Sequence, residues 1–254
     1  MQNDISLAQW ALVEEFRSGK IRTLDFPQIA RNDFGLNGIE LVNTLMEVPT
    51  QRYLDELKMN AQKNNVQIVL IMVDDEGDGC AGAPAESMQF FINHRKWIDI
   101  AKYLGCHAIR TNCRGRIEED PKKALDQAMA TYLPLLEYAQ KAGIKVLIEN
   151  HGGFSNDPEW MVALFRKMAH RFFGSLPDWR EPGALFDNTG YLRKMVPYAG
   201  GMSVRLQPDE NKTAEMIGIC EQGGYKGWYG VESDGRPAIY ETIRLLKKYL
   251  RDQE

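Results

Sequence analysis

Residues Lys145–Gly153 read KVLIENHGG. A short aliphatic run ends abruptly in a carboxylate, an amide and an imidazole, and the two glycines that follow permit a tight turn. This pattern is typical of a buried strand that opens into a site, because ligands bind outside the carboxyl ends of parallel strands. We therefore expect Glu149 and His151 to lie at the rim of a parallel sheet.

Three other strand-like runs also end in polar residues. They are Gly183–Asn188, Gly201–Gln207 and Trp228–Ser233. Because the carboxyl ends of parallel strands meet at one edge of the sheet, we expect Asp187 and Glu232 to join Glu149 at the same rim.

Strand-like and helix-like segments alternate along the whole chain. Eight such pairs, each about 32 residues long, fill the 254 residues, a length typical of a (β/α)8 TIM barrel. We therefore predict a single α/β barrel domain over residues 1–254. A doubly wound sheet is the rival fold, but the glycine-rich dinucleotide loop expected after its first strand is missing. The expected strands are Ile5–Leu12, Gly38–Asn43, Gln67–Val73, Cys106–Asn112, Lys145–Glu149, Gly183–Asn188, Met202–Gln207 and Tyr229–Ser233.

Composition narrows the class of protein. A net charge of -4 and an isoelectric point near 5.7 argue against a nucleic-acid binder, which needs clustered lysine and arginine. No apolar run approaches the ~20 residues that span a bilayer, and the start of the chain lacks a signal-peptide pattern, so we expect no membrane attachment. The four cysteines form no CxxC pair. Cysteines without such pairing indicate a reducing, cytoplasmic location. A leader peptide that is later removed is also compatible with the sequence.

Three carboxylates at one rim need compensation, because like charges brought together are costly. A divalent cation such as Mg²⁺ or Mn²⁺ would supply it, and pairing with arginine or lysine is the alternative. A bound metal could chelate a hydroxyl and a carbonyl of a sugar and favour enolisation of the carbon between them. Glu149 and Glu232 are then the candidate acid/base pair on opposite faces of that carbon, and Asp187 mainly holds the ion.

Further candidate substrate-binding residues lie at expected strand ends. Arg205 could stabilise an enolate oxygen, bind an anionic group or neutralise the acidic cluster. His151 could bind a substrate hydroxyl or the metal, or serve only as a loop residue. The acidic loop Asp74–Gly79 lacks the full EF-hand pattern, which favours a solvated rim loop. The complete set of candidate substrate-binding residues is Trp10, Arg110, Asn112, His151, Asn188, Arg205 and Gln207.

Four segments together resemble the xylose isomerase-like TIM barrel superfamily, specifically its sugar phosphate isomerases and epimerases. They are Trp97–Arg110, Ile148–His151, Phe186–Asn188 and Gly223–Glu232. The resemblance extends over nearly the whole chain. It implies a small carbohydrate substrate and a divalent metal (Mn, Mg, Zn or Co) held by Glu149, Asp187 and Glu232, with the two glutamates moving the proton.

The resemblance breaks at Ser203, where the family's usual metal-binding histidine would fall. A serine hydroxyl is a poorer ligand, so Gln207, His151 or water completes the coordination, or the metal is weak or absent. The sequence thus predicts a metal-dependent isomerase or epimerase of a sugar or sugar phosphate that removes and returns a proton next to a carbonyl. A lyase acting on 3-keto-glycosides and a catalytically silent sugar-binding barrel are the alternatives. The superfamily's zinc endonucleases use many more histidines than the four present here. A homo-oligomer is compatible with the sequence, which does not name the sugar.

Overall fold

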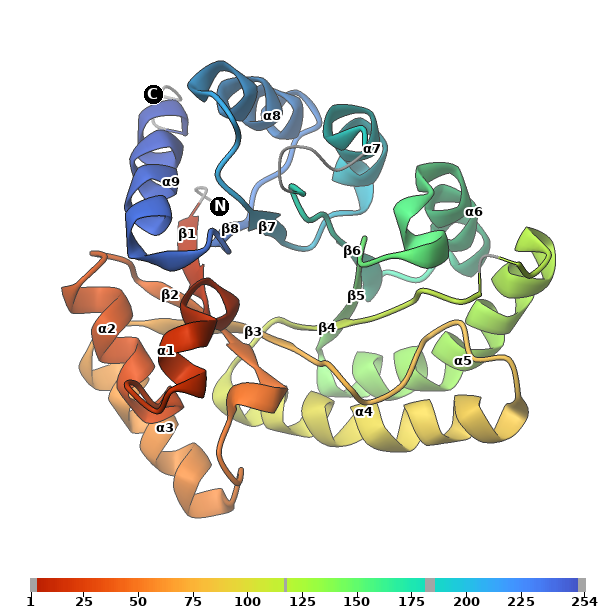
Figure 1. Cartoon of the computed structure of the whole chain (residues 1–254). Helices are drawn as coiled ribbons and strands as arrows, with labels where there is room; N and C mark the ends of the chain where they lie inside the picture. The colour runs from red at the N-terminus through yellow and green to blue at the C-terminus, as the bar shows by residue number, and fades with distance from the viewer. Residues whose placement is uncertain (1–3, 117, 181–185, 251–254) are drawn as a thin grey trace.

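Eight parallel strands form a barrel at the centre of a ring of helices (Figure 1). This computed structural model describes residues 4–116, 118–180 and 186–250. The strand order is β6-β5-β4-β3-β2-β1-β8-β7, so neighbours in the sheet are consecutive in the chain apart from the pairing of β1 with β8. This order confirms the predicted TIM barrel.

Seven of the eight expected strands are present within a few residues of their predicted bounds. The strands are β1 (Asp4–Ala8), β2 (Gly38–Val42), β3 (Gln67–Met72), β4 (Ala108–Thr111), β5 (Lys145–Glu149), β6 (Phe173–Leu176), β7 (Met202–Val204) and β8 (Trp228–Val231). The helices are α1 (Val13–Arg17), α2 (Phe26–Asn32), α3 (Gln51–Lys63), α4 (Pro84–Leu104), α5 (Pro121–Ala142), α6 (Pro158–Met168), α7 (Asn188–Met195), α8 (Glu210–Gln222) and α9 (Gly235–Tyr249).

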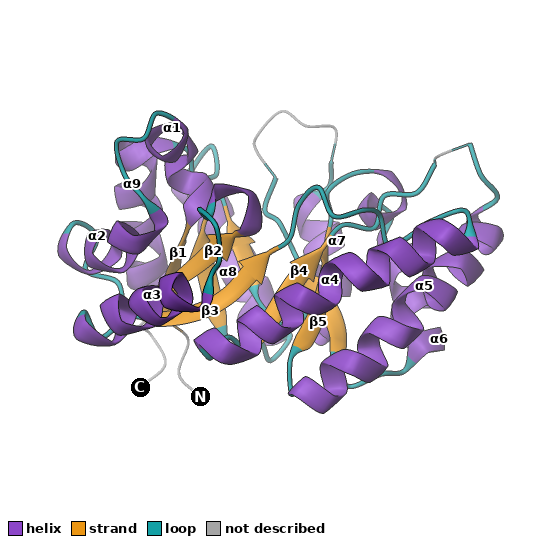
Figure 2. Ribbon diagram, turned by 90° about the horizontal axis from the view of Figure 1, so that it is seen from below, coloured by secondary structure: helices purple, strands orange, loops and turns teal. Residues whose placement is uncertain are grey.

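Helix boundaries follow local chemistry. Helix α5 begins after Asp120, whose side chain accepts a hydrogen bond from the backbone N–H of Lys123, and has Pro121 in its first turn. It ends at Gly143, whose φ of 78° lies in the left-handed region that glycine adopts without a steric penalty. The same helix packs beside α4 along one side of the barrel (Figure 2).

The sixth strand is the one that was wrongly predicted. The structure forms β6 from Phe173–Leu176 (FGSL), about ten residues before the expected run at Gly183–Asn188. Residues 183–185 of that run lie outside the described residues, and Asn188 begins α7. Glycine and serine have low strand propensity, so pairing with β5 and burial select this segment rather than its composition.

The seam between β6 and β7 is nearly closed. Isolated bridges pair Ser175 with Ala199 and Asp178 with Ser203. The backbone N–H of Ser203 donates to the carbonyl of Pro177 at 3.0 Å, and that of Trp179 donates to the carbonyl of Ser203 at 2.9 Å. These bonds bring the ends of β6 and β7 close together, and β7 pairs with β8 on its other side.

Two apolar clusters stabilise the barrel. The larger one lies between the strands and the surrounding helices. The smaller one fills the barrel interior and includes Ala8, Val42, Leu70, Leu147 and Leu176. No helix in the described part of the chain is both long and apolar enough to cross a membrane.

Candidate active site

Three buried carboxyl groups meet at the carboxyl ends of the strands. Glu149 ends β5, Asp178 follows β6 by two residues, and Glu232 follows β8 directly. Their exposed fractions are 2%, 3% and 4%. The structure therefore brings Glu149 and Glu232 to one rim, as predicted, and adds Asp178.

Asp178 is fixed beside the end of β5 by a reciprocal pair of hydrogen bonds. The backbone N–H of Asp178 donates to Oδ1 of Asn150 at 2.8 Å, and Nδ2 of Asn150 donates to the carbonyl of Asp178 at 3.0 Å. Asn150 is fully buried. Because a side-chain amide bonds both backbone groups, the position of Asp178 is set by β5 as well as by its own strand.

Arg205 joins Asp178 to Glu232. Its Nε donates to Oδ1 of Asp178 at 3.0 Å, and its Nη2 donates to Oε1 of Glu232 at 2.6 Å. The other oxygen of Glu232, Oε2, accepts a 2.6 Å hydrogen bond from the hydroxyl of Ser203. The guanidinium of Arg205 thus bonds both carboxyl groups, and the hydroxyl of Ser203 bonds Glu232 alone.

Arg110 makes a second charge bridge, from Asp74 to Glu149. Its Nη1 and Nη2 donate to the two oxygens of Asp74 at 2.6 and 3.1 Å, the forked geometry that suits a guanidinium. Its Nε lies 2.8 Å from Oε2 of Glu149, although the two atoms are not aligned for a hydrogen bond. Only 1% of the Arg110 side chain is exposed. Arg110 therefore links Asp74 to Glu149 from a buried position.

His151, which contacts the buried Asn112, extends this group toward solvent. Nδ1 of His151 lies 3.1 Å from Oδ1 of Asn112, and Nδ2 of Asn112 donates to Asp74 at 2.9 Å. Burial, followed by the charges of Arg110 and Arg114, lowers the pKa of His151 to about 4. The imidazole is therefore neutral at neutral pH, and with 33% of its side chain exposed it can bond a ligand hydroxyl.

Burial raises the pKa of Asp178 and of Glu232 above their ordinary values. For Glu232 the negative charge of Glu149 adds to this effect, while Arg205 and Ser203 oppose it. For Asp178 the charge of Arg205 opposes burial, and Glu149 and Glu232 reinforce it. A carboxyl group whose pKa is raised toward neutrality can both accept and return a proton, which is the requirement of acid/base catalysis.

A fourth buried acid, Glu40, lies in the barrel interior. The hydroxyl of Ser6 donates to its Oε1 at 2.7 Å, and its Oε2 has no hydrogen-bond partner. Burial raises the pKa of Glu40 to about 8. A Cβ at Gly230 would lie 2.3 Å from Oε1 of Glu40, so the glycine on β8 makes room for this side chain.

Asp187 does not occupy the position expected of it. Its side chain is exposed, and its Oδ1 accepts hydrogen bonds from the backbone N–H of Gly190 and the hydroxyl of Thr189 at the start of α7. These bonds lower the pKa of Asp187. The prediction failed because the sixth strand lies earlier in the chain, and Asp178 stands where that strand ends.

Three of the predicted substrate-binding residues have other partners. The amide of Gln207 donates to the carbonyls of Trp179 and Arg205 at 3.1 and 3.0 Å, and that of Asn188 donates to the carbonyl of Arg180 at 2.9 Å. These contacts fix the loops at the ends of β6 and β7. Trp10 is half-buried and packs against the cluster inside the barrel.

Sequence reasoning missed Asp74, Asn150 and Asp178. Asp74 is the first polar residue after a buried run, which is the signal that singled out Glu149, but it belongs to a loop that was predicted to be solvated. It is only 12% exposed and forms the ion pair with Arg110. Its pKa is lowered, because the charge and hydrogen bonds of Arg110 outweigh the opposing effect of burial.

The donor set does not fit a divalent metal in this arrangement. Among the described residues, no group of three or more His, Cys, Asp and Glu side chains is placed to hold a metal ion. Arg205 lies between Asp178 and Glu232, and the hydroxyl of Ser203 donates a hydrogen bond to the second oxygen of Glu232, so both oxygens of Glu232 already have partners within the protein. The predicted metal is therefore not supported by the geometry of the site.

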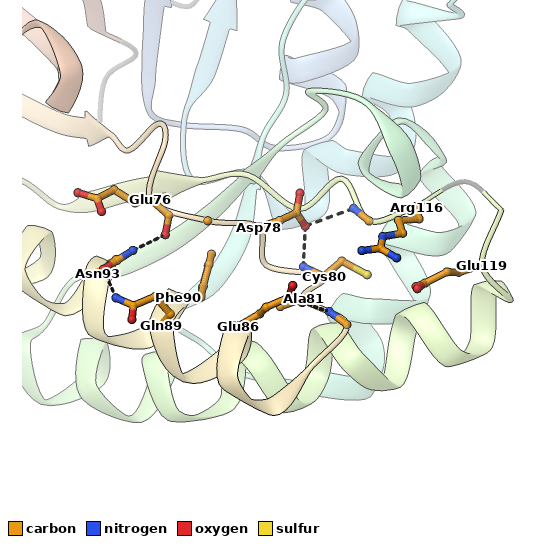
Figure 3. A pocket seen from close by; sticks show the side chains of 13 residues that line it. Glu76, Asp78, Cys80, Ala81, Glu86, Gln89, Phe90, Asn93, Arg116 and Glu119 are labelled. Carbon is orange, nitrogen blue, oxygen red and sulfur yellow. Dashed lines mark hydrogen bonds between the residues drawn. The ribbon is translucent and has the colours of Figure 1, made fainter.

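A cavity of about 360 Å³ lies outside this cluster (Figure 3). The β3–α4 loop, the first turns of α4 and the β4–α5 loop line it. Asp78 at its wall accepts hydrogen bonds from the backbone N–H groups of Cys80 and Arg114 at 2.8 and 2.9 Å. The Asp78 carboxylate thus ties the two loops together, and the cavity shares none of the three rim carboxyl groups.

The fold and the polar strand ends define a TIM barrel with its candidate site at the carboxyl end of the strands, where enzymes of this fold place their active sites. The chain belongs to the xylose isomerase-like TIM barrel family, whose sequence profile matches residues 29–189, more than half of its length.

Solved structures of similar fold include a D-tagatose 3-epimerase-like protein, at 15% identity and TM-score 0.78, with 97% of each chain covered. A 3-keto-D-glucoside 4-epimerase from E. coli is 11% identical, with TM-score 0.70 and coverage of 98% of this chain and 99% of that one. A xylose isomerase-like TIM barrel protein from Mycobacterium smegmatis in complex with magnesium is 13% identical, with TM-score 0.70 and coverage of 98% and 95%. Among curated proteins, none matches this sequence.

Proposed function

We propose that this protein is an isomerase or epimerase of a small carbohydrate that removes and returns a proton beside a carbonyl group. The observation that carries the proposal is the meeting of Glu149, Asp178 and Glu232 with two arginines at one barrel mouth. Such a cluster combines groups that move protons with fixed positive charges that stabilise an oxyanion. Epimerases of small sugars among the neighbours of similar fold support the same class of substrate.

In this proposal Glu149 and Glu232 exchange the proton on opposite faces of the reacting carbon. Glu149 takes the proton, and the electrons of the C–H bond move to the carbonyl oxygen to form an enediolate. Protonation of the carbon by Glu232 from the other face gives the epimer, and the two carboxyl groups re-equilibrate through solvent. His151, which is neutral and partly exposed, binds a substrate hydroxyl.

Hydrogen exchange in D₂O tests the proposal. Purified protein is incubated with a panel of ketoses, their phosphates and 3-keto-glycosides, and deuterium incorporation is followed by NMR. We expect one substrate to gain deuterium at the carbon beside its carbonyl without net elimination. Glu149→Gln and Glu232→Gln should each slow this exchange by roughly 100-fold or more. Glu215→Gln, at an exposed position on α8, is the matched control and should exchange normally.

The other outcomes have distinct meanings. Formation of an unsaturated product would identify a lyase instead. Binding of a sugar without exchange, measured by calorimetry, would identify a carbohydrate-binding barrel without catalytic activity.

A further inference from the structure

The two arginines of the site occupy the place that a bound cation would take. A divalent metal shared by Asp178 and Glu232 would need carboxylate oxygens facing a common point. In this structure Nε and Nη2 of Arg205 bind one oxygen of each, at 3.0 and 2.6 Å. The guanidinium therefore already neutralises the charge that a metal would neutralise.

Other carboxylate oxygens at the rim also face donors or cationic groups of the protein itself. Oε2 of Glu232 accepts the hydrogen bond of Ser203, which is fully buried. Glu149 faces Nε of Arg110, and Arg110 is anchored on its other side by both oxygens of Asp74. A cation at this rim would have to displace both guanidinium groups and leave at least one of them buried beside it, which is electrostatically costly.

Most of the negative charge of the site is compensated without a metal. Asp74, Glu149, Asp178 and Glu232 face Arg110 and Arg205, and Arg180 adds a third guanidinium whose Nε lies 3.7 Å from Asp178. Three guanidinium groups therefore offset all but one of the four carboxylate charges before any divalent ion is added.

We propose that this barrel acts without a divalent metal and that Arg205 is the catalytic residue that supplies the positive charge for the anionic oxygen of the substrate. Arg205 suits this role because 19% of its side chain remains exposed at the rim while Asp178 and Glu232 hold its guanidinium in place. A fixed guanidinium stabilises an enediolate oxygen by charge and hydrogen bonding, and its pKa keeps it protonated. The part that concerns catalysis rests on the proposed function, but the part that concerns the metal does not.

Mn²⁺ binding, followed by the EPR signal of the free ion, tests the proposal without any sugar. We expect the wild-type protein to bind Mn²⁺ with a Kd weaker than about 1 mM. The double variant Ser203→His/Arg205→Ala removes the guanidinium and adds an imidazole beside Asp178 and Glu232, and it should bind with a Kd of about 10 µM. Arg205→Gln is a smaller change that also removes the guanidinium from the two carboxylates. It should improve Mn²⁺ affinity less than the double variant does, and it provides the test if the double variant does not fold.

Tight Mn²⁺ binding by the wild type that is lost in Glu232→Gln would overturn the inference. A folded Arg205→Gln protein and a folded double variant that both bind no better than the wild type would also overturn it, since the guanidinium would then not occupy a cation site. Once a substrate is found, EDTA treatment should leave the exchange rate unchanged, and Arg205→Lys should lower kcat more than it raises KM. An inactive protein that binds no Mn²⁺ would refute the proposed function and leave the metal inference standing.

Discussion

The hydroxyl of Ser203 donates a 2.6 Å hydrogen bond to Oε2 of Glu232. This contact pairs the residue that departs from the family pattern with one of the two candidate acid/base groups. A hydrogen bond to the charged form of a carboxyl group lowers its pKa, so Ser203 limits the rise that burial imposes on Glu232.

Ser203→Ala should therefore raise the pKa of Glu232. In the proposed mechanism Glu232 returns the proton and acts in its protonated form, so the alkaline limb of the pH profile of kcat/KM should move to higher pH. Ser203→Thr keeps the hydroxyl and should leave the limb in place. An unchanged limb in the alanine variant would show that Glu232 does not set the pH dependence.

Asp178 and Asp187 should behave in opposite ways on substitution. Asp178→Asn removes the carboxylate that orients Arg205 and should lower kcat/KM by roughly 100-fold or more. Asp187→Ala removes only a helix-capping oxygen, so it should cost about 1 kcal/mol of stability and leave kcat/KM nearly unchanged. Steady-state kinetics and urea unfolding of both variants check this. If Asp187→Ala lost as much activity as Asp178→Asn, Asp187 would have to belong to the active site.

Arg110 should be more important for stability than its single charge suggests. Arg110→Met leaves Asp74 and Glu149 buried without their shared cation, so unfolding in urea should show a loss of about 3–5 kcal/mol. Asp74→Asn/Arg110→Met removes one of the two stranded charges and should recover part of that loss. If the single and the double variant are equally stable, the Asp74–Arg110 pair contributes little.

Much of the barrel was predictable because local sequence and tertiary position agree. The run that ends in Glu149, Asn150 and His151 is apolar where it is buried and polar where the strand opens, so its pattern alone identified β5 and the rim. Arg110 and Asn112 are two residues apart, so their side chains are expected on the same face of an extended strand, and both do donate to Asp74.

The sixth strand and the charge pairing were not predictable in the same way. Phe173–Leu176 becomes a strand because β5 offers it a pairing partner, whereas its own residues do not favour that conformation. The predictions also took the rim acids as ligands for an ion, with arginine pairing only as the alternative. The choice between metal binding and arginine pairing depends on where the fold places Arg110 and Arg205 relative to the rim acids. Arg110 comes from β4 and Arg205 from the end of β7, and the sequence does not give their distances to these acids.

Glu40 provides a prediction about stability and pH. Its pKa is about 8 in the folded protein and near 4.5 in the unfolded chain, so the folded state binds its proton more tightly. The contribution to stability is therefore fully present below pH 4.5 and is lost as the pH rises from 4.5 to 8. Glu40→Gln removes this ionisation and can still accept the hydrogen bond of Ser6. It should thus stabilise the protein at pH 7, by about 1–3 kcal/mol.

Urea unfolding of Glu40→Gln and the wild type across pH 5 to 8 measures this effect. The difference between the two proteins should widen steadily with pH, because the wild type alone must keep a carboxyl group protonated inside the barrel. Glu56→Gln, an exposed substitution on α3, is the control and should give a small difference at every pH. A constant difference for Glu40→Gln would mean that Glu40 is ionised in the folded protein, in which case Arg110 would have to balance its charge as well as those of Asp74 and Glu149.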